Sequence, residues 1–310
     1  MADARPAAPT IGALISEATA RLRASGSPSP RLDAELLLGH ALRIDRAGLL
    51  AMPELTVGPE VARAFGESVA RRERGEPVAY IRGLKEFYGL AFSVDPRALI
   101  PRPETERLVE IALERVREAL LGQPRPAGTP ALRVWDVGTG SGAIAISVAV
   151  ECRRRGYADD VRVLATDSSA DALALATENT VGHGVADTVT LRRADLADLD
   201  AVTAAEWLPV ELLCANLPYV PTAVLPELPV AASFEPTAAL DGGADGLAVV
   251  RRLLPALPSV LASGGLALLE IGADQADAVA DAVAAALPGW RLTVQRDLAG
   301  LPRVVELARP

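Results

Sequence analysis

A glycine-rich turn between a predicted strand and a predicted helix is the stretch of this sequence best suited to bind a ligand. The apolar residues 132–137 predict the strand, and glycine then occupies every second position, at Gly138, Gly140 and Gly142. Glycine adopts φ values that other residues avoid and lets a ligand approach the backbone closely. The helix predicted from Ala143 adds free N–H groups and a positive dipole end at the same point. We therefore expect a nucleoside cofactor here, unless the segment is an ordinary strand–helix turn of an α/β domain.

The spacing of these glycines indicates which cofactor to expect. A dinucleotide fingerprint has the spacing Gly-x-Gly-x-x-Gly, whereas this turn has Gly-x-Gly-x-Gly, with Asp136 at the end of the preceding strand. S-adenosylmethionine (SAM) suits that arrangement, because its amino-acid end carries a carboxylate for the helix and an ammonium group for an acid. The residues of this stretch that we expect to bind SAM are Asp136, Gly138, Thr139, Gly140, Ser141 and Gly142.

Polar residues also follow the next two predicted strands. Asp167 comes after the strand over 161–166, and Asp195 and Leu196 come after the strand over 189–193. In open α/β sheets, ligands bind at the carboxyl ends of the strands. We expect Asp167 to accept hydrogen bonds from both ribose hydroxyls, although an acid at this place could instead cap the following helix. Asp195 and Leu196 are expected beside the adenine, with Leu196 as an apolar wall.

A fourth predicted strand ends in the candidate reactive element, the tetrapeptide Asn216-Leu217-Pro218-Tyr219. The side-chain oxygen of Asn216 and the backbone carbonyl of Leu217 could each accept one hydrogen of a planar –NH2 group, and the Tyr219 ring could stack on the plane of the target. We therefore assign Asn216, Leu217, Pro218 and Tyr219 to catalysis, with Asn216 also bordering the cofactor. The alternative is a strand-ending turn in which the asparagine bonds only its own backbone.

The elements that position these residues follow from the alternation of apolar strands and helices. Such alternation predicts a parallel sheet covered on both faces, with strands over 132–137, 161–166, 189–193, 210–215 and 266–271 and a closing antiparallel pair over 291–294 and 304–307. The predicted fold class is α/β, a doubly wound and mostly parallel sheet. We divide the chain into a helical domain over 1–75, a connecting β-hairpin over 76–100 and the sheet domain over 101–310.

Composition excludes several classes of function. The chain has 310 residues and a net charge of −9, which disfavours a surface built to neutralise phosphates. Cys152 and Cys214 stand in apolar surroundings and predict buried, reduced thiols. With His40 and His183 as the only histidines, no spacing suggests a metal site. No signal peptide or membrane-spanning run is evident, so we expect a cytoplasmic protein.

Besides the glycine turn, several motifs from about residue 76 onward are distinctive. They are Tyr80-Ile81-x-Gly83, Glu86-Phe87-Tyr88-Gly89-Leu90, Ile100-Pro101-Arg102-Pro103-Glu104-Thr105-Glu106, Ala239-Leu240-Asp241-Gly242-Gly243, Leu269-Glu270-Ile271-Gly272, and Asp297-Leu298-Ala299-Gly300 with Arg303-Val304-Val305. In these motifs the chain resembles bacterial peptide-chain release factor glutamine N5-methyltransferases. The resemblance implies a class I SAM-dependent methyltransferase that methylates the glutamine of the Gly-Gly-Gln motif in class I release factors. The helical domain would then bind that protein partner, with no direct nucleic-acid contact.

One position departs from the family. Its usual tetrapeptide is Asn-Pro-Pro-Tyr, whereas Leu217 gives this chain the form seen in ribosomal RNA adenine dimethyltransferases. An adenine-N6 methyltransferase is therefore one alternative, although it would be expected to carry a basic cleft. A second alternative is a glutamine methyltransferase acting on a ribosomal protein, and a third is an inactive scaffold that only binds a partner. The segment from Arg102 to Thr105 favours the release-factor branch.

Overall fold

The computed structural model describes residues 8–121 and 131–310. The chain forms two compact units, one of Met1–Leu84 with Pro229–Phe234 and one of Lys85–Leu228 with Glu235–Pro310. The two units meet in the sequence at Leu84 and Lys85, inside the segment 76–100 that was expected to connect the domains. Among the described residues, no helix is both long and apolar enough to cross a membrane.

The first unit is a bundle of helices: α1 (Ile11–Ala24), α2 (Pro30–Leu42), α3 (Arg46–Ala51), α4 (Pro59–Glu73) and α5 (Val78–Arg82). Its core consists of apolar side chains from these helices, including Leu22, Leu37 and Phe65. Prolines at the first turns of α2 and α4 suit those positions, where the backbone N–H has no partner within the helix. The connecting β-hairpin expected over 76–100 is wrong over residues 78–82, which form α5.

The second unit is built on a seven-stranded sheet of order β5-β4-β3-β6-β7-β9-β8. Its strands are β3 (Leu132–Val137), β4 (Val161–Asp167), β5 (Val189–Arg193), β6 (Val210–Ala215), β7 (Leu261–Glu270), β8 (Arg291–Arg296) and β9 (Pro302–Ala308). The first five are parallel, and β9 lies antiparallel between β7 and β8. The predicted fold class is confirmed, including the antiparallel pair.

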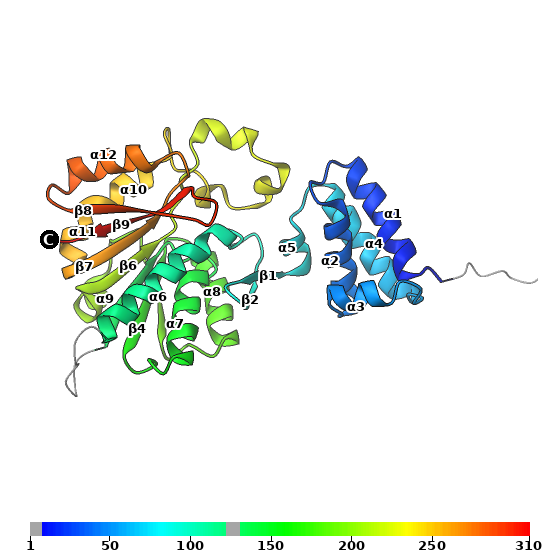
Figure 1. The fold of residues 1–310 in the computed structure, drawn as a ribbon, viewed down its shortest axis with the longest axis horizontal. Helices are drawn as coiled ribbons and strands as arrows, with labels where there is room; N and C mark the ends of the chain where they lie inside the picture. Colours follow the sequence, from blue (N-terminus) through cyan, green and yellow to red (C-terminus); the bar gives the residue numbers. More distant parts are fainter. Residues whose placement is uncertain (1–7, 122–130) are drawn as a thin grey trace, which may run out of the picture. The chain divides into compact units, whose positions relative to one another are not determined.

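Helices cover both faces of this sheet, which buries its apolar strands (Figure 1). On one face lie α6 (Glu106–Leu121), α7 (Ala143–Arg154) and α8 (Ala170–Gly182). On the other face, a hydrophobic core forms between the sheet and four helices: α9 (Ala201–Trp207), α10 (Ala248–Leu253), α11 (Leu257–Val260) and α12 (Ala276–Ala286). Short 3-10 turns occupy Pro103–Thr105, Thr222–Glu227, Val230–Phe234, Thr237–Ala239 and Leu254–Ala256.

The register of the central strands aligns the predicted site residues. Val137 of β3 pairs with Thr166 of β4 on one side and with Ala215 of β6 on the other. The residues that follow these strands therefore emerge at one edge of the sheet. Because β4 and β6 flank β3, the order of the strands reverses at β3, and open α/β sheets bind their ligands at such a switch point.

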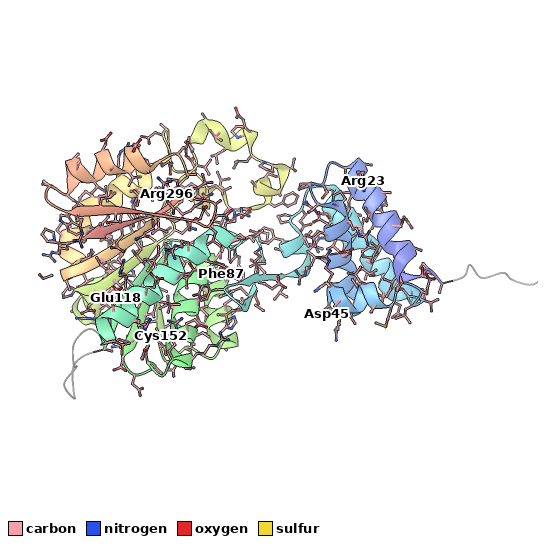
Figure 2. The ribbon with its side chains drawn as sticks, viewed as in Figure 1. Arg23, Asp45, Phe87, Glu118, Cys152 and Arg296 are labelled. Carbon is pink, nitrogen blue, oxygen red and sulfur yellow. The ribbon has the colours of Figure 1, made fainter. Side chains whose placement is uncertain are left out.

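A buried asparagine of α8 connects the glycine turn to a two-stranded hairpin, made of β1 (Leu84–Phe87) and β2 (Leu90–Ser93). Phe87, which is labelled in Figure 2, lies in this hairpin. Its ring packs edge to face against that of Phe92, with ring centroids 6.0 Å apart. Asn179 of α8 accepts a hydrogen bond from the Ser93 N–H at 2.8 Å and donates to the carbonyls of Ser93 and Ser141, at 3.0 and 2.9 Å. This one side chain thereby joins the hairpin, α8 and the glycine turn.

Candidate active site

A cavity of about 320 Å³ lies at the carboxyl edge of the sheet, within the size range of small-molecule sites. The predicted site residues that line it are Gly138, Thr139, Gly140, Ser141, Asp167, Asp195, Leu196, Asn216, Leu217 and Pro218. Three others, Asp136, Gly142 and Tyr219, are not in its wall. The structure thus brings the glycine turn, the acids after β4 and β5 and the tetrapeptide after β6 around a single space.

The three glycines of the turn serve different geometric needs, although all have positive φ. At Gly142 a Cβ would lie 2.8 Å from Ile146 Cδ1, and at Gly138 it would lie 3.1 Å from Leu217 Cδ2, so both positions face packed protein. At Gly140 the nearest atom would be the Ala98 Cβ at 3.9 Å. A side chain at Gly140 would therefore enter the cavity, which is the place where a ligand needs the close approach of the backbone.

Asp136 stabilises the glycine turn and the first turn of α7 through hydrogen bonds. Its carboxylate is fully buried and accepts hydrogen bonds at Oδ2 from the Thr139 hydroxyl at 2.7 Å and from the Ala145 N–H at 3.1 Å. Its Oδ1 has no hydrogen-bond partner in the described part of the chain. Burial, helped by the charge of Asp167, raises the Asp136 pKa to about 7. The expected contact of Asp136 with a cofactor ammonium group stays a prediction.

Asp167 lines the cavity, and both of its carboxylate oxygens accept backbone hydrogen bonds. One oxygen accepts the Gly140 N–H and the other the Ser169 N–H, both at 2.9 Å. A carboxylate oxygen has two acceptor sites, so each oxygen retains one for a ligand. The side chain that caps α8 is a neighbour, Ser169, whose hydroxyl accepts the Ala172 N–H at 3.2 Å. Asp167 therefore supports the glycine turn and still presents acceptors to the cavity.

The rim of the cavity near β5 combines an apolar residue with an ion pair. Leu196 has a φ of +54°, a left-handed conformation that is unusual for leucine. Asp195 pairs with Arg252, which lies in the last turn of α10, at 2.6 Å. Both partners of this pair are more than half exposed, so it contributes little to stability. Leu196 lines the cavity, and its contact with adenine stays a prediction.

The amide of Asn216 is held by a residue that sequence analysis assigned no role. Its Nδ2 donates to the Thr105 hydroxyl at 3.0 Å, and Thr105 also lines the cavity. Its Oδ1 has no hydrogen-bond partner among residues 8–121 and 131–310. This amide oxygen is therefore free to accept a hydrogen bond, and its role towards a substrate –NH2 group stays a prediction. In the sequence, the segment from Arg102 to Thr105 distinguishes the release-factor branch from related families, and this segment also contains the partner of Asn216.

Two further contacts support the tetrapeptide and its surroundings. Arg102 pairs with the buried carboxylate of Glu235 at 2.5 Å, and that carboxylate also accepts the Ile100 N–H at 3.1 Å. Gln275 donates from Nε2 to the Tyr219 carbonyl at 2.9 Å. Burial raises the Tyr219 pKa to about 12, so its phenol is neutral at physiological pH.

Gly246 gives a first testable prediction, because it contacts the same carbonyl. A methyl group there would overlap the Tyr219 carbonyl oxygen and Gln275 Nε2 at a φ of +78°. We expect Gly246→Ala to displace Tyr219 and to lower kcat about tenfold, since small misplacements of reacting groups are costly. Gly264→Ala is the matched control, with a similar φ of +73° and open space around the new methyl. It should cost only the strain of about 1–2 kcal/mol in thermal unfolding. Equal kcat values for the two variants would contradict the role given to Gly246.

Comparison with known proteins places the chain in a family. Residues 13–83 match the family described as the PrmC N-terminal domain. A release factor glutamine methyltransferase of Moorella thermoacetica is 43% identical over 272 residues, which cover 88% of this chain and 89% of that protein. The release factor glutamine methyltransferase of Nitratidesulfovibrio vulgaris is 38% identical over 298 residues, covering 96% and 94%.

The chain belongs to the release factor glutamine methyltransferase family. Its fold is also that of a more distant protein, the hMettl16 catalytic domain solved in complex with the MAT2A 3'UTR hairpin 1. That structure superposes with a TM-score of 0.52 and 15% identity over 84% of this chain and 87% of the other. At that identity the likeness concerns the fold alone.

Leu217, where this chain departs from the usual tetrapeptide of the release factor glutamine methyltransferase family, gives a second prediction. Both leucine and proline present a backbone carbonyl, and the Leu217 N–H donates no backbone hydrogen bond in the described residues. Leu217 also precedes Pro218, which already restricts it to extended conformations. We therefore expect Leu217→Pro to keep glutamine methylation within about tenfold of wild type. Loss of all activity, measured by methyl transfer to a release factor, would show that the side chain itself selects the substrate.

Proposed function

We propose that this protein transfers a methyl group from SAM to the side-chain amide nitrogen (N5) of the glutamine in the Gly-Gly-Gln motif of class I release factors. The observation that carries the proposal is Asn216 at the cavity wall, with its Nδ2 held by Thr105 and its Oδ1 free beside the glycine turn. The family relationship names the protein substrate, and a reaction in the cytoplasm follows from a substrate that acts in translation.

The residues around the cavity fit SAM. The first residues of α7, Ala143 and Ile144, line the cavity, and the first N–H groups of a helix have no partner within it, which suits the carboxylate of an amino acid. The open side of Gly140 lets the ligand approach the backbone, and Asp167 retains acceptors for ribose hydroxyls. Leu196 offers an apolar surface to the adenine. When bound, SAM supplies an electrophilic methyl group.

The tetrapeptide prepares the amide for attack. An amide nitrogen is a weak nucleophile because its lone pair is delocalised into the carbonyl. Asn216 Oδ1 and the Leu217 carbonyl would each accept one of its hydrogens and fix the –NH2 plane. These two acceptors also stabilise the positive charge that develops on nitrogen during methyl transfer. Both groups are prepositioned, because Thr105 holds the side chain of Asn216 and Leu217 is buried against the turn.

We further propose that the helical unit binds the release factor away from its Gly-Gly-Gln loop. This proposal is supported by the family match over residues 13–83, which lies outside the unit that holds the cavity. It leads to a third prediction: methylation requires the folded factor. Steady-state kinetics with a Gly-Gly-Gln peptide should give a far higher KM than with the intact release factor. Equal KM values for peptide and protein would remove the docking role.

A direct test of the chemistry compares three acceptors under one SAM concentration: the intact release factor, an adenine-containing oligonucleotide and a ribosomal protein mixture. The proposal predicts methyl transfer to the release factor alone. Methyl transfer to the oligonucleotide would favour the alternative of an adenine-N6 methyltransferase, which the Asn-Leu-Pro-Tyr tetrapeptide suggests. No methyl transfer to any of the three acceptors would favour an inactive protein that only binds a partner.

A further inference from the structure

On the strand next to Asn216 lies a buried carboxylate that the proposed chemistry does not use. Glu270 ends β7, next to the strand that delivers Asn216, and is 1% exposed. Neither of its oxygens accepts a hydrogen bond of normal geometry in the described chain. A buried carboxylate without a partner is costly, so its position calls for a donor nearby. The Thr105 hydroxyl, which contacts Asn216 at 3.0 Å, is close enough to lower the Glu270 pKa, and we assign it as that donor.

Thr105 connects Glu270 to Asn216 through the two roles of one hydroxyl. A hydroxyl donates one hydrogen and can accept others. Its oxygen already accepts a hydrogen bond from Asn216 Nδ2 at 3.0 Å. Its own hydrogen is then available to the Glu270 carboxylate, which as an anion can only accept. When the Thr105 hydroxyl donates its hydrogen to Glu270, it can only accept from Asn216. The Asn216 amide then has Nδ2 towards Thr105 and Oδ1 towards the cavity.

We propose that Glu270 is a positioning residue that acts through Thr105 to fix the orientation of the Asn216 amide. The inference rests on the proposed function, because it explains how the acceptor oxygen comes to face the substrate –NH2 group. When Glu270 is protonated, its carboxyl group can donate to Thr105 instead. The hydroxyl then turns its hydrogen to Asn216, and the amide rotates so that Nδ2 faces the cavity and repels the substrate hydrogens.

The surroundings of Glu270 make this switch operate near neutral pH. Burial raises the Glu270 pKa to about 7. The charged groups that face it are Arg303 from β9 and Arg102, which both lower the pKa, and Glu104, which raises it. Tyr219 faces it from the loop after β6 and stays neutral in this range. Activity should therefore rise with pH through about 7, as Glu270 loses its proton.

The first test is the pH dependence of kcat for methylation of the release factor. The wild type should show a step centred near pH 7, which Glu270→Gln abolishes because glutamine does not titrate. Thr105→Val should lower kcat about tenfold at pH 8 and also abolish the step, with little change in KM for SAM, whereas Thr105→Ser restores both. The double variant Thr105→Val/Glu270→Gln should be no slower than Thr105→Val alone. A step that persists in both single variants would assign the titration to another group, such as Asp136, and overturn the inference.

A second measurement needs no substrate, so it separates failure of this inference from failure of the proposed function. The chain has only two asparagines, Asn179 and Asn216. Selective ¹⁵N-asparagine labelling therefore gives two side-chain amide signals, which Asn216→Ala assigns. We expect the Asn216 signal to shift with a midpoint near pH 7 in the wild type and to stay constant in Glu270→Gln, with Asn179 as internal reference. An Asn216 signal that does not respond to pH between 5 and 9 would refute the switch, whatever the substrate.

Discussion

Asn216→Ala is expected to lower kcat for release-factor methylation by about a hundredfold or more, the scale for loss of one transition-state contact. The variant removes the oxygen that accepts a substrate hydrogen, while the Leu217 carbonyl still accepts the other. SAM affinity should change little, because the glycine turn and Asp167 are untouched. Single-turnover kinetics at saturating SAM give the methyl-transfer rate directly.

Two controls keep that result interpretable. Thermal unfolding should show that Asn216→Ala remains folded, since Asn216 makes one side-chain hydrogen bond in the described structure, to Thr105. Leu217→Pro, at the adjacent position, should stay within about tenfold of wild type. A rate for Asn216→Ala within tenfold of wild type, in a folded protein, would show that the asparagine is only part of a strand-ending turn.

Asp167→Ala is expected to weaken SAM binding by about 2 kcal/mol or more, the scale of charge-assisted hydrogen bonds. That loss corresponds to roughly a thirtyfold higher Kd. The effect has two sources, because the carboxylate would bind the ribose hydroxyls and also accepts the N–H groups of Gly140 and Ser169. Isothermal titration calorimetry measures the change.

Asp171→Ala is the matched control for Asp167→Ala. Asp171 lies in the first turn of α8, is exposed and does not line the cavity, so its removal takes away the same charge four residues along. We expect it to leave the Kd for SAM within about twofold, because exposed charges at this distance are screened by salt. If both variants bind SAM as the wild type does, Asp167 has no place in the ribose site.

The sheet and its ligand edge were predictable because they depend on local patterns. Five apolar runs separated by helices specify parallel strands, and the polar residues at the ends of the first four runs then lie at one edge. The exception was α5, where aromatic and apolar residues suggested a strand. Pro77 precedes that segment, and Gly83 ends it with a φ of +66°. This pairing of proline and glycine is a helix signal that outweighed the composition.

The partners of the site residues could not be read from one sequence, because they come together only through the fold. Thr105 and Asn216 are 111 positions apart, and Glu270 belongs to a different strand. Gly246 and Gln275 meet the Tyr219 carbonyl from two further segments. A hydrogen bond between distant segments produces no periodic pattern and no characteristic residue spacing in the sequence. Sequence therefore indicated which residues face the ligand, and the structure adds the residues that hold them.

Mass spectrometry of the release factor tests the central claim most directly. The purified factor, unmodified at the start, is incubated with SAM and either the wild-type protein or Asn216→Ala, and the tryptic peptide that contains Gly-Gly-Gln is fragmented. The account predicts one added methyl group on the glutamine side chain with the wild type and almost none with the variant. A peptide that stays unmodified with the wild type, or a methyl group at any other residue, would contradict it.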